Sequence, residues 1–261
     1  MRAANLGKVV FAAVMIGLGL IGLISRDFAP IWQPSPKGVP EREVLAYLCG
    51  ALSLAGGAGL LWRPVAAPAA RGLLIYLVAW LLIFRVTAIV QAPVSQESWS
   101  GFGETAVIVA GAWALHVRLA DDWDRRRLAF STGNTGLRIA RSLYGVALIP
   151  FGIAHFIYAR QTAAMVPGWL PAHTAWAYAT GAAYLAAGAA ILADLFARAA
   201  AMLSAVQIGL FTLLVWAPRI AAGSAGAETW SETIISVTLT AGAWVIADSY
   251  GETASRVAGT A

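Results

Sequence analysis

His155 is a polar residue in an otherwise apolar stretch, GIAHFIYAR. Gly152, His155 and Tyr158 follow one another at helical spacing, so they share one face of a helix. An imidazole in this place could hydrogen-bond or protonate a ligand, because its charge changes near neutral pH. The alternative is a structural histidine that bonds to the adjacent loop. That loop, MVPGWLPAHTAWAYATG, adds Trp169 and Trp176 to the candidate ligand-binding site.

Arg85 is a second candidate, because it lies deep in an apolar run that begins GLLIYLVAWLLIF. Charged residues within a membrane usually face the interior of a bundle and are paired. Glu104, near the start of the next apolar run, is the expected partner. The structural alternatives are an ion pair or a snorkelling arginine. The functional interpretation is an anchor for an anionic or carbonyl-bearing ligand. Arg219 and Glu232 flank the corresponding hairpin of the second half, at shifted positions.

The histidines and the cysteine do not form a metal or redox motif. His116, His155 and His173 lie in different segments, without the spacing of metal ligands. We expect His116 at a membrane interface and His173 near a helix start. The single cysteine, Cys49, has no partner for an internal disulfide and is expected to be a packing residue. The sequence assigns no catalytic residue and leaves open whether the chain is an enzyme.

The composition indicates a membrane protein. Of 261 residues, 59% are hydrophobic and 12% are charged, whereas soluble domains carry about 25% charged residues. A bilayer-spanning helix needs about 20 mostly apolar residues, and several segments reach that length. The alternating ten-residue segments of a β-barrel are absent from the sequence. We therefore predict an all-α polytopic membrane protein with eight spans, at about 8–25, 42–62, 69–92, 102–119, 137–159, 173–193, 197–218 and 230–248.

The two halves of the chain share residues at a constant offset of 131. Pro36 and Pro40 recur as Pro167 and Pro171, and the motifs WS and AGAW recur at the same offset. The pattern predicts a duplicated four-helix unit, with a degenerate first unit (1–120), a basic linker (121–136) and a second unit (137–261). In the first unit, Ser25 would take the place of His155, and Gly38 the place of Trp169.

The distribution of positive charge predicts the orientation. The net charge of +5 comes from Lys and Arg in short loops, so we attribute it to topology and not to nucleic-acid binding. These residues concentrate on the side that holds both termini and the central linker, which is therefore expected to be cytoplasmic. Each unit has an even number of spans, so the repeats would be parallel. Tryptophans should mark the membrane surfaces, with Trp32, Trp99, Trp169, Trp176 and Trp230 outside and Trp62 and Trp123 inside.

The amino-terminal segment imitates a secretory signal, with a basic start and an apolar run. We expect no cleavage, because a small-x-small site does not follow the run and because the run has a counterpart at 137–159.

The second half resembles the DoxX/DoxD-like family of bacterial integral membrane proteins. The pattern joins a Gly-x-x-His-Phe helix end, a Val-Pro-x-Trp-Leu-Pro connection and an aromatic-rich helix with Thr-Gly. The matching residues are Gly152, His155, Phe156, Val166, Pro167, Trp169, Leu170, Pro171, Trp176, Tyr178, Thr180, Gly181 and Gly188. A typical family member is one four-helix unit, so the chain is similar to a fused tandem of two.

The resemblance implies a location in the bacterial inner membrane and a redox association. Some relatives are membrane subunits of a thiosulfate:quinone oxidoreductase, which makes a quinone the ligand to consider. The chain has no haem, flavin or iron–sulfur motif, so electrons would come from a partner redox protein or a soluble reductant. Two alternatives remain open at this stage. One is a non-catalytic membrane scaffold or assembly factor, and the other is a small-solute permease with a path between the units.

Overall fold

The computed structural model describes residues 3–32, 39–223 and 226–258. The regular structure in these ranges is entirely helical, without a β-strand, as the composition predicts. The helices of the first half are α1 (Ala3–Ser25), η1 (Pro30–Trp32), α2 (Arg42–Leu61), η2 (Arg63–Val65), α3 (Ala66–Trp80), η3 (Leu81–Val86), α4 (Thr87–Gln91) and α5 (Gln96–Leu119).

The second half repeats this order after a short connection. The connection holds α6 (Asp122–Arg127) and η4 (Ala129–Ser131). The helices that follow are α7 (Gly133–Ile157), α8 (Ala159–Met165), α9 (His173–Leu192), α10 (Ala197–Phe211), η5 (Thr212–Trp216), α11 (Ala217–Ala221) and α12 (Ala227–Ala258). In each half a hairpin of two helices, α1 with α2 and α7 with α9, is followed by a helix that contains a π-helical turn.

Seven stretches in the described part of the chain are long and apolar enough to cross a membrane. They are Leu6–Ser25, Arg42–Leu61, Arg63–Gln91, Gly133–Ile157, His173–Leu192, Ala197–Ala221 and Ala227–Gly251. The eighth expected span corresponds to α5, which is of similar length but carries Glu104, His116 and Arg118. Several long apolar helices in an all-α fold are what a membrane protein requires, because a helix satisfies its own backbone hydrogen bonds in lipid.

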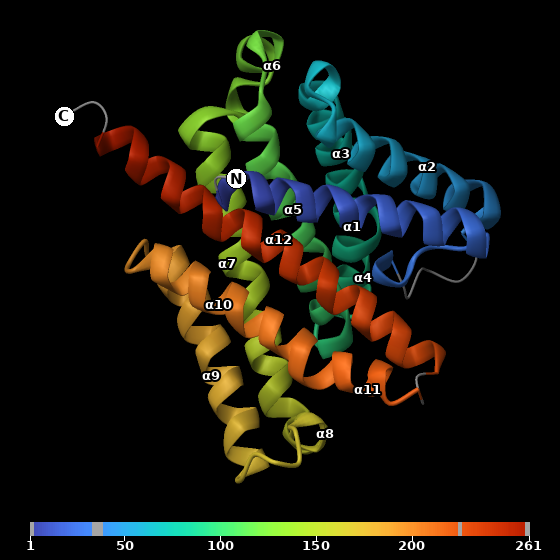
Figure 1. Ribbon diagram of the computed structural model, residues 1–261, viewed down its shortest axis with the longest axis vertical. Helices are drawn as coiled ribbons and strands as arrows, with labels where there is room; N and C mark the ends of the chain where they lie inside the picture. Colours follow the sequence, from blue (N-terminus) through green and yellow to red (C-terminus); the bar gives the residue numbers. More distant parts are fainter. Residues whose placement is uncertain (1–2, 33–38, 224–225, 259–261) are drawn as a thin grey trace.

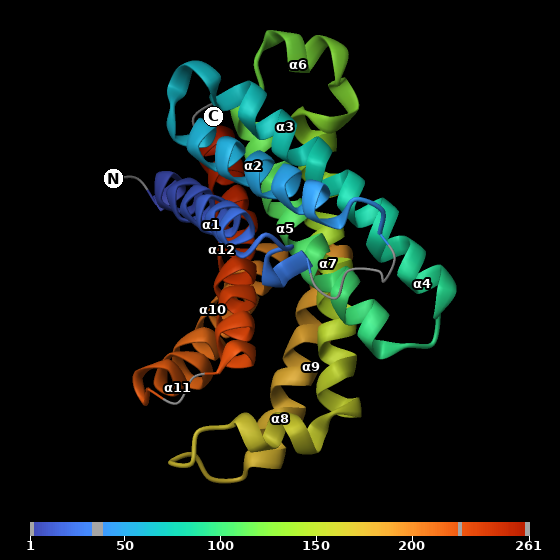
Figure 2. The same cartoon turned by 90° about the vertical axis from the view of Figure 1, so that its right-hand side faces the viewer.

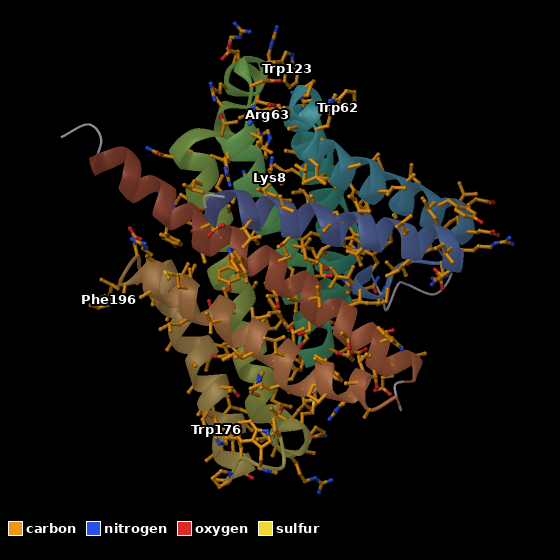
Figure 3. All side chains as sticks on the ribbon, viewed as in Figure 1. Lys8, Trp62, Arg63, Trp123, Trp176 and Phe196 are labelled. Atoms are coloured by element: carbon orange, nitrogen blue, oxygen red, sulfur yellow. The ribbon has the colours of Figure 1, made fainter. Side chains whose placement is uncertain are left out.

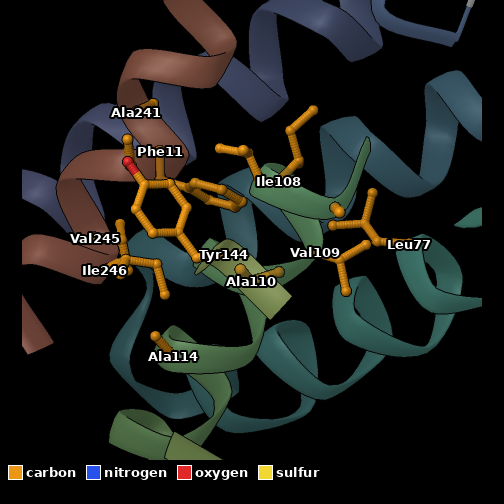
Figure 4. Packing of buried hydrophobic residues seen from close by; sticks show 14 of the residues in the cluster. Phe11, Leu77, Ile108, Val109, Ala110, Ala114, Tyr144, Ala241, Val245 and Ile246 are labelled. Atoms are coloured by element: carbon orange, nitrogen blue, oxygen red, sulfur yellow. The ribbon is translucent and has the colours of Figure 1, made fainter. Parts of the chain in front are cut away.

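Helix α5 lies at the centre of the molecule and packs against helices of both halves (Figure 1). A continuous run from Thr105 to Ala112 is buried. Around it, Phe11 of α1 and Tyr144 of α7 belong to the same buried cluster, which Figure 4 shows between α5 and α12. His116, expected at a membrane interface, belongs to this buried part of α5: it is 1% exposed and bonds to Ser131 Oγ at 3.1 Å.

Glycines let helices of the two halves approach closely at α5 and α12. A Cβ added to Gly111 would lie 2.9 Å from the Cα of Gly242, and one added to Gly242 would lie 2.9 Å from the carbonyl oxygen of Val107. Both glycines belong to AGAW motifs, so two residues related by the offset of 131 touch each other. Close backbone approach through small residues is the usual way in which membrane helices pack.

Backbone features recur at the same offset. Residues Glu41 and Ala172, just before α2 and α9, are both left-handed, with φ of 48° and 56°. The π-helical turns η3 and η5 begin at Leu81 and Thr212. These positions differ by 131, so the later helices of each half follow the offset that the sequence indicates.

The first helix of each half follows a different offset. An added Cβ at Gly50 would meet Gly19 O and Leu23, and one at Gly181 would meet Gly152 O and Phe156. Gly19 and Gly152 differ by 133, as do Leu23 and Phe156. The counterpart of His155 is therefore Gly22 and not Ser25, because the first hairpin is longer than the second. Gly38, the expected counterpart of Trp169, lies outside the described residues.

The two ends of the molecule differ in shape. Figure 2 shows α7, α8 and α9 diverging from α10, α11 and α12 toward the end that is lowest in the view. At the opposite end, α6 is fastened to α3 by a salt bridge of 2.7 Å from Arg71 to Asp124, whose carboxylate is fully buried. Trp62 and Trp123 lie at that end and Trp176 at the other (Figure 3), as expected for tryptophans at two membrane surfaces.

Candidate functional site

A cavity of about 490 Å³ lies where the helices of the second half diverge. Its lining comes from α7, α8 and α9 on one side, from α10, η5, α11 and α12 on the other, and from the first turns of α5. Aromatic side chains form much of the wall: Phe151, Tyr158, Tyr184, Phe211 and Trp216. This size and apolar character are typical of sites for small organic ligands.

His155 lines the cavity from the last turns of α7. Its Nδ1 lies 2.7 Å from the carbonyl oxygen of Phe151, and its ring packs 5.3 Å from that of Tyr184. A carbonyl accepts, so Nδ1–H must donate, and in a neutral ring Nε2 is then an acceptor. Within the described part of the chain, Nε2 has no hydrogen-bond partner. His155 is thus held by its own helix, and not by a bond to the Pro-Trp loop that the structural alternative expected.

Glu104 and Ser100 reach the cavity from α5. Glu104 interacts electrostatically with Arg85 and, across the cavity, with Glu232. Arg85 lies behind it, 5% exposed, within η3. Its Nε donates to Thr105 Oγ1 at 3.1 Å, and its Nη2 donates to the backbone oxygen of Ile31 at 3.2 Å. Arg85 and Glu104 are therefore neighbours, as expected, but only the carboxylate borders the cavity.

The helices α11 and α12 supply further charges. Glu228, Glu232 and Ser236 line the cavity from one face of α12, since they are four residues apart. Arg219 of α11 lies with its guanidinium carbon 5.1 Å from the ring centre of Trp216, which is within the range of a cation–π contact. The cavity thus combines aromatic walls with an excess of carboxylates.

The structure divides the residues that were expected to form a site. His155, Tyr158 and Glu104 line one cavity. Arg85 does not line it but interacts electrostatically with Glu104. Trp169 and Trp176 do not line it, and they are 72% and 46% exposed. Their exposure suits the surface role that the sequence also predicted. The Val-Pro-x-Trp-Leu-Pro connection therefore adds no tryptophan to the cavity.

Several lining residues were missed from the sequence alone. Tyr184, Trp216, Glu228 and Ser236 were not among the candidates, and Glu232 was noted only for its position near a hairpin. A signal for the α12 face exists, because Glu228, Glu232, Ser236 and Leu239 recur at helical spacing in a mostly apolar segment. Polar residues near a helix start are usually solvated, so their spacing alone does not predict a buried face.

The profile of a family described as "Domain of unknown function (DUF8561)" matches residues 144–247, which run from α7 into α12. No curated protein and no solved structure matches the chain. The matched segment contains most of the cavity lining but not Ser100 or Glu104. The resemblance to DoxX/DoxD-like proteins stays a prediction.

Proposed function

We propose that the protein is a DoxX-like subunit of the bacterial inner membrane, associated with a redox system, and that the cavity of its second half binds a small ligand. The observation that carries this proposal is the cavity of about 490 Å³ beside His155. A neutral His155 offers Nε2 to a ligand, and protonated His155 would donate from the same atom. A quinone, which has carbonyl oxygens and an apolar body, is the ligand that the resemblance implies.

The proposal includes a topology of eight spans in two parallel four-helix units. Support comes from the features repeated at an offset of 131, and from the contact between Gly111 and Gly242. With both termini on the cytoplasmic side, as the loop charges predict, the cavity would open toward the outer leaflet. Electrons would be supplied by a partner redox protein or a soluble reductant.

The test is to purify the full chain from native membranes in mild detergent and to identify bound small molecules by mass spectrometry. We expect a stoichiometric small molecule that is lost in His155→Ala. His173→Ala is the matched control, because His173 does not line the cavity. A chain without any bound molecule, together with unchanged behaviour of His155→Ala, would refute the ligand site.

Two other functions remain as alternatives. A scaffold or assembly factor would co-purify with a partner protein and have a cavity without ligand. A small-solute permease would transport solute in proteoliposomes, by way of a path between the halves. The cavity residues favour the ligand site over the scaffold, because a scaffold has no need of a polar group aimed into an apolar space.

A further inference from the structure

The first half holds a guanidinium at the position where the second half has its cavity. Arg85 is buried in the first half, where it bonds to Thr105 Oγ1 and Ile31 O. Its Nη1 also lies close to Gly101, since a Cβ added there would be 3.2 Å away. Trp80, 4% exposed, is the last residue of α3 and directly precedes the π-helical turn that carries Arg85.

The counterparts of these residues at the offset of 131 all border the cavity. The π-helical turns that carry Arg85 and Trp216 begin at matching positions, which fixes the alignment of the two halves here. The first-half residues are Trp80, Arg85, Gly101, Thr105 and Ile108. Their counterparts, in the same order, are Phe211, Trp216, Glu232, Ser236 and Leu239, and each of them lines the cavity.

Two of these differences change the charge. Arg85 corresponds to Trp216, so the second half has an aromatic ring in place of the buried cation. Gly101 corresponds to Glu232, so a carboxylate is added at the place that the guanidinium of Arg85 contacts in the first half. Among the described residues that line the cavity, Glu232 joins Glu104 and Glu228, and Arg219 supplies one guanidinium. Arg85, behind Glu104, offsets one of these carboxyl groups, which leaves three carboxyl groups against two guanidinium groups around the cavity.

We propose that the cavity binds an organic cation, an amidinium, guanidinium or ammonium group on an apolar body. The cationic group would lie between Glu232 and the ring of Trp216, where its charge meets a carboxylate and a π-face. It would lie beside Glu232 as the guanidinium of Arg85 lies beside Gly101 in the first half. This proposal rests on the ligand site proposed above and specifies the chemical class of its ligand. Finding a neutral quinone in the cavity would contradict the cation proposal.

The experiment compares two probes of the same shape. Equilibrium dialysis of the full chain in detergent, with empty micelles as blank, measures binding of 4-phenylbenzamidine, a cation at pH 7, and of neutral 4-phenylbenzamide. We expect the amidine to bind at least about tenfold more tightly, since one additional charge pair in a partly desolvated site is worth a factor of this order. Glu232→Gln should remove most of this preference and leave amide binding unchanged.

Glu97→Gln is the matched control for charge. Glu97 is the exposed counterpart of Glu228 in the first half and does not line the cavity, so its neutralisation should not change the affinity for the amidine. Trp216→Arg supplies an internal cation, as in the first half, and should abolish amidine binding, whereas Trp216→Phe should retain it.

Equal affinity for the two probes, or an unchanged preference in Glu232→Gln, would overturn the cation proposal. Loss of both probes in Ala154→Trp, which obstructs the cavity, would then show that the cavity is still a ligand site. Failure of the cation proposal is thus separable from failure of the proposed function, which the mass-spectrometric test decides by itself. If neither probe binds, the cation proposal is also overturned.

Discussion

The interiors of the two halves differ in what occupies them. In the first half the hairpin segment after α1 turns inward, and Trp32, 1% exposed, packs 5.2 Å from the ring of Trp80 and 5.7 Å from that of Tyr76. Arg85 lies beside this aromatic cluster and bonds to Ile31 of the same hairpin. In the second half the equivalent hairpin forms α8 at the edge of a cavity, and its Trp169 faces outward. One scaffold thus supports a packed interior and a hollow one.

Substitution of the hairpin tryptophans, Trp32 and Trp169, should give the largest difference in stability between the two halves. Trp32→Ala removes a fully buried side chain and should lower the free energy of unfolding by about 3–5 kcal/mol. Trp169→Ala removes a side chain that is 72% exposed and should change it by less than about 0.5 kcal/mol. Unfolding in detergent, with helicity as the readout, measures both. Similar losses in the two variants would show that the two hairpins pack alike.

The arginines give a second, smaller contrast. Arg85→Met deletes hydrogen bonds of a buried guanidinium to Thr105 and Ile31, and should cost about 2–3 kcal/mol, as is typical for hydrogen bonds to charged groups. Arg219→Met affects an exposed side chain in the second half and should cost less than about 0.5 kcal/mol. The same unfolding measurement applies. A cost below 0.5 kcal/mol for Arg85→Met would mean that the buried cation does not stabilise the first half.

Added volume distinguishes a packed interior from a hollow one more directly. Gly101→Leu would push against the guanidinium of Arg85 and should destabilise the protein by about 1–2 kcal/mol through overpacking. Ala154→Leu extends into the cavity of the second half and should leave the stability unchanged or slightly raised. If both variants were equally destabilised, the cavity would have to be closed in the protein in solution.

The smallest effect is expected at the junction between the halves. Asp121 caps α6, where the backbone N–H of Asp124 donates to its carboxylate at 2.8 Å, and this hydrogen bond lowers the pKa of Asp121. Because the pKa is lowered in the folded state, the cap stabilises α6 at pH values above the pKa of an unfolded aspartate, about 3.9. This stabilisation is lost as the pH falls below that value. Hydrogen exchange of the α6 amides should therefore accelerate as the pH is lowered toward 3, beyond the intrinsic change. Asp121→Asn should show a smaller acceleration, because Asp124 and its salt bridge to Arg71 remain, and an identical pH profile in both proteins would contradict the assignment.

The spans could be predicted from the sequence because hydropathy is a sum over neighbouring residues. The helices α2, α9 and α10 lie close to the predicted segments, and the offset of 131 holds for their repeated positions. The first helices depart from it, since α1 has few distinctive residues and the hairpin that shifts the offset follows it. The counterpart of His155 was placed wrongly at Ser25 for that reason.

The direction of a side chain could not be predicted from the sequence where it depends on the path of a loop. Trp32 was expected at the membrane surface, as amphipathic tryptophans usually are, but the loop folds it into the core. Trp169 and Trp176 were included in the candidate site for their nearness in sequence to His155, and they point elsewhere. Glu104 was found because it is charged within an apolar segment. Glu232 was not, because only the packing of α12 against α5 and α7 brings it to the same cavity.

The contact between Gly111 and Gly242 bears on how such a chain could arise. Two equivalent residues can touch only near an axis that exchanges the halves, and a contact of this kind is self-complementary. A single ancestral unit with this glycine could therefore have paired with its own copy before any duplication joined the two. Fusion would then have fixed one copy beside the other and released them from having to be identical. The hollow half would have stayed open to ligand while its twin closed around an arginine of its own.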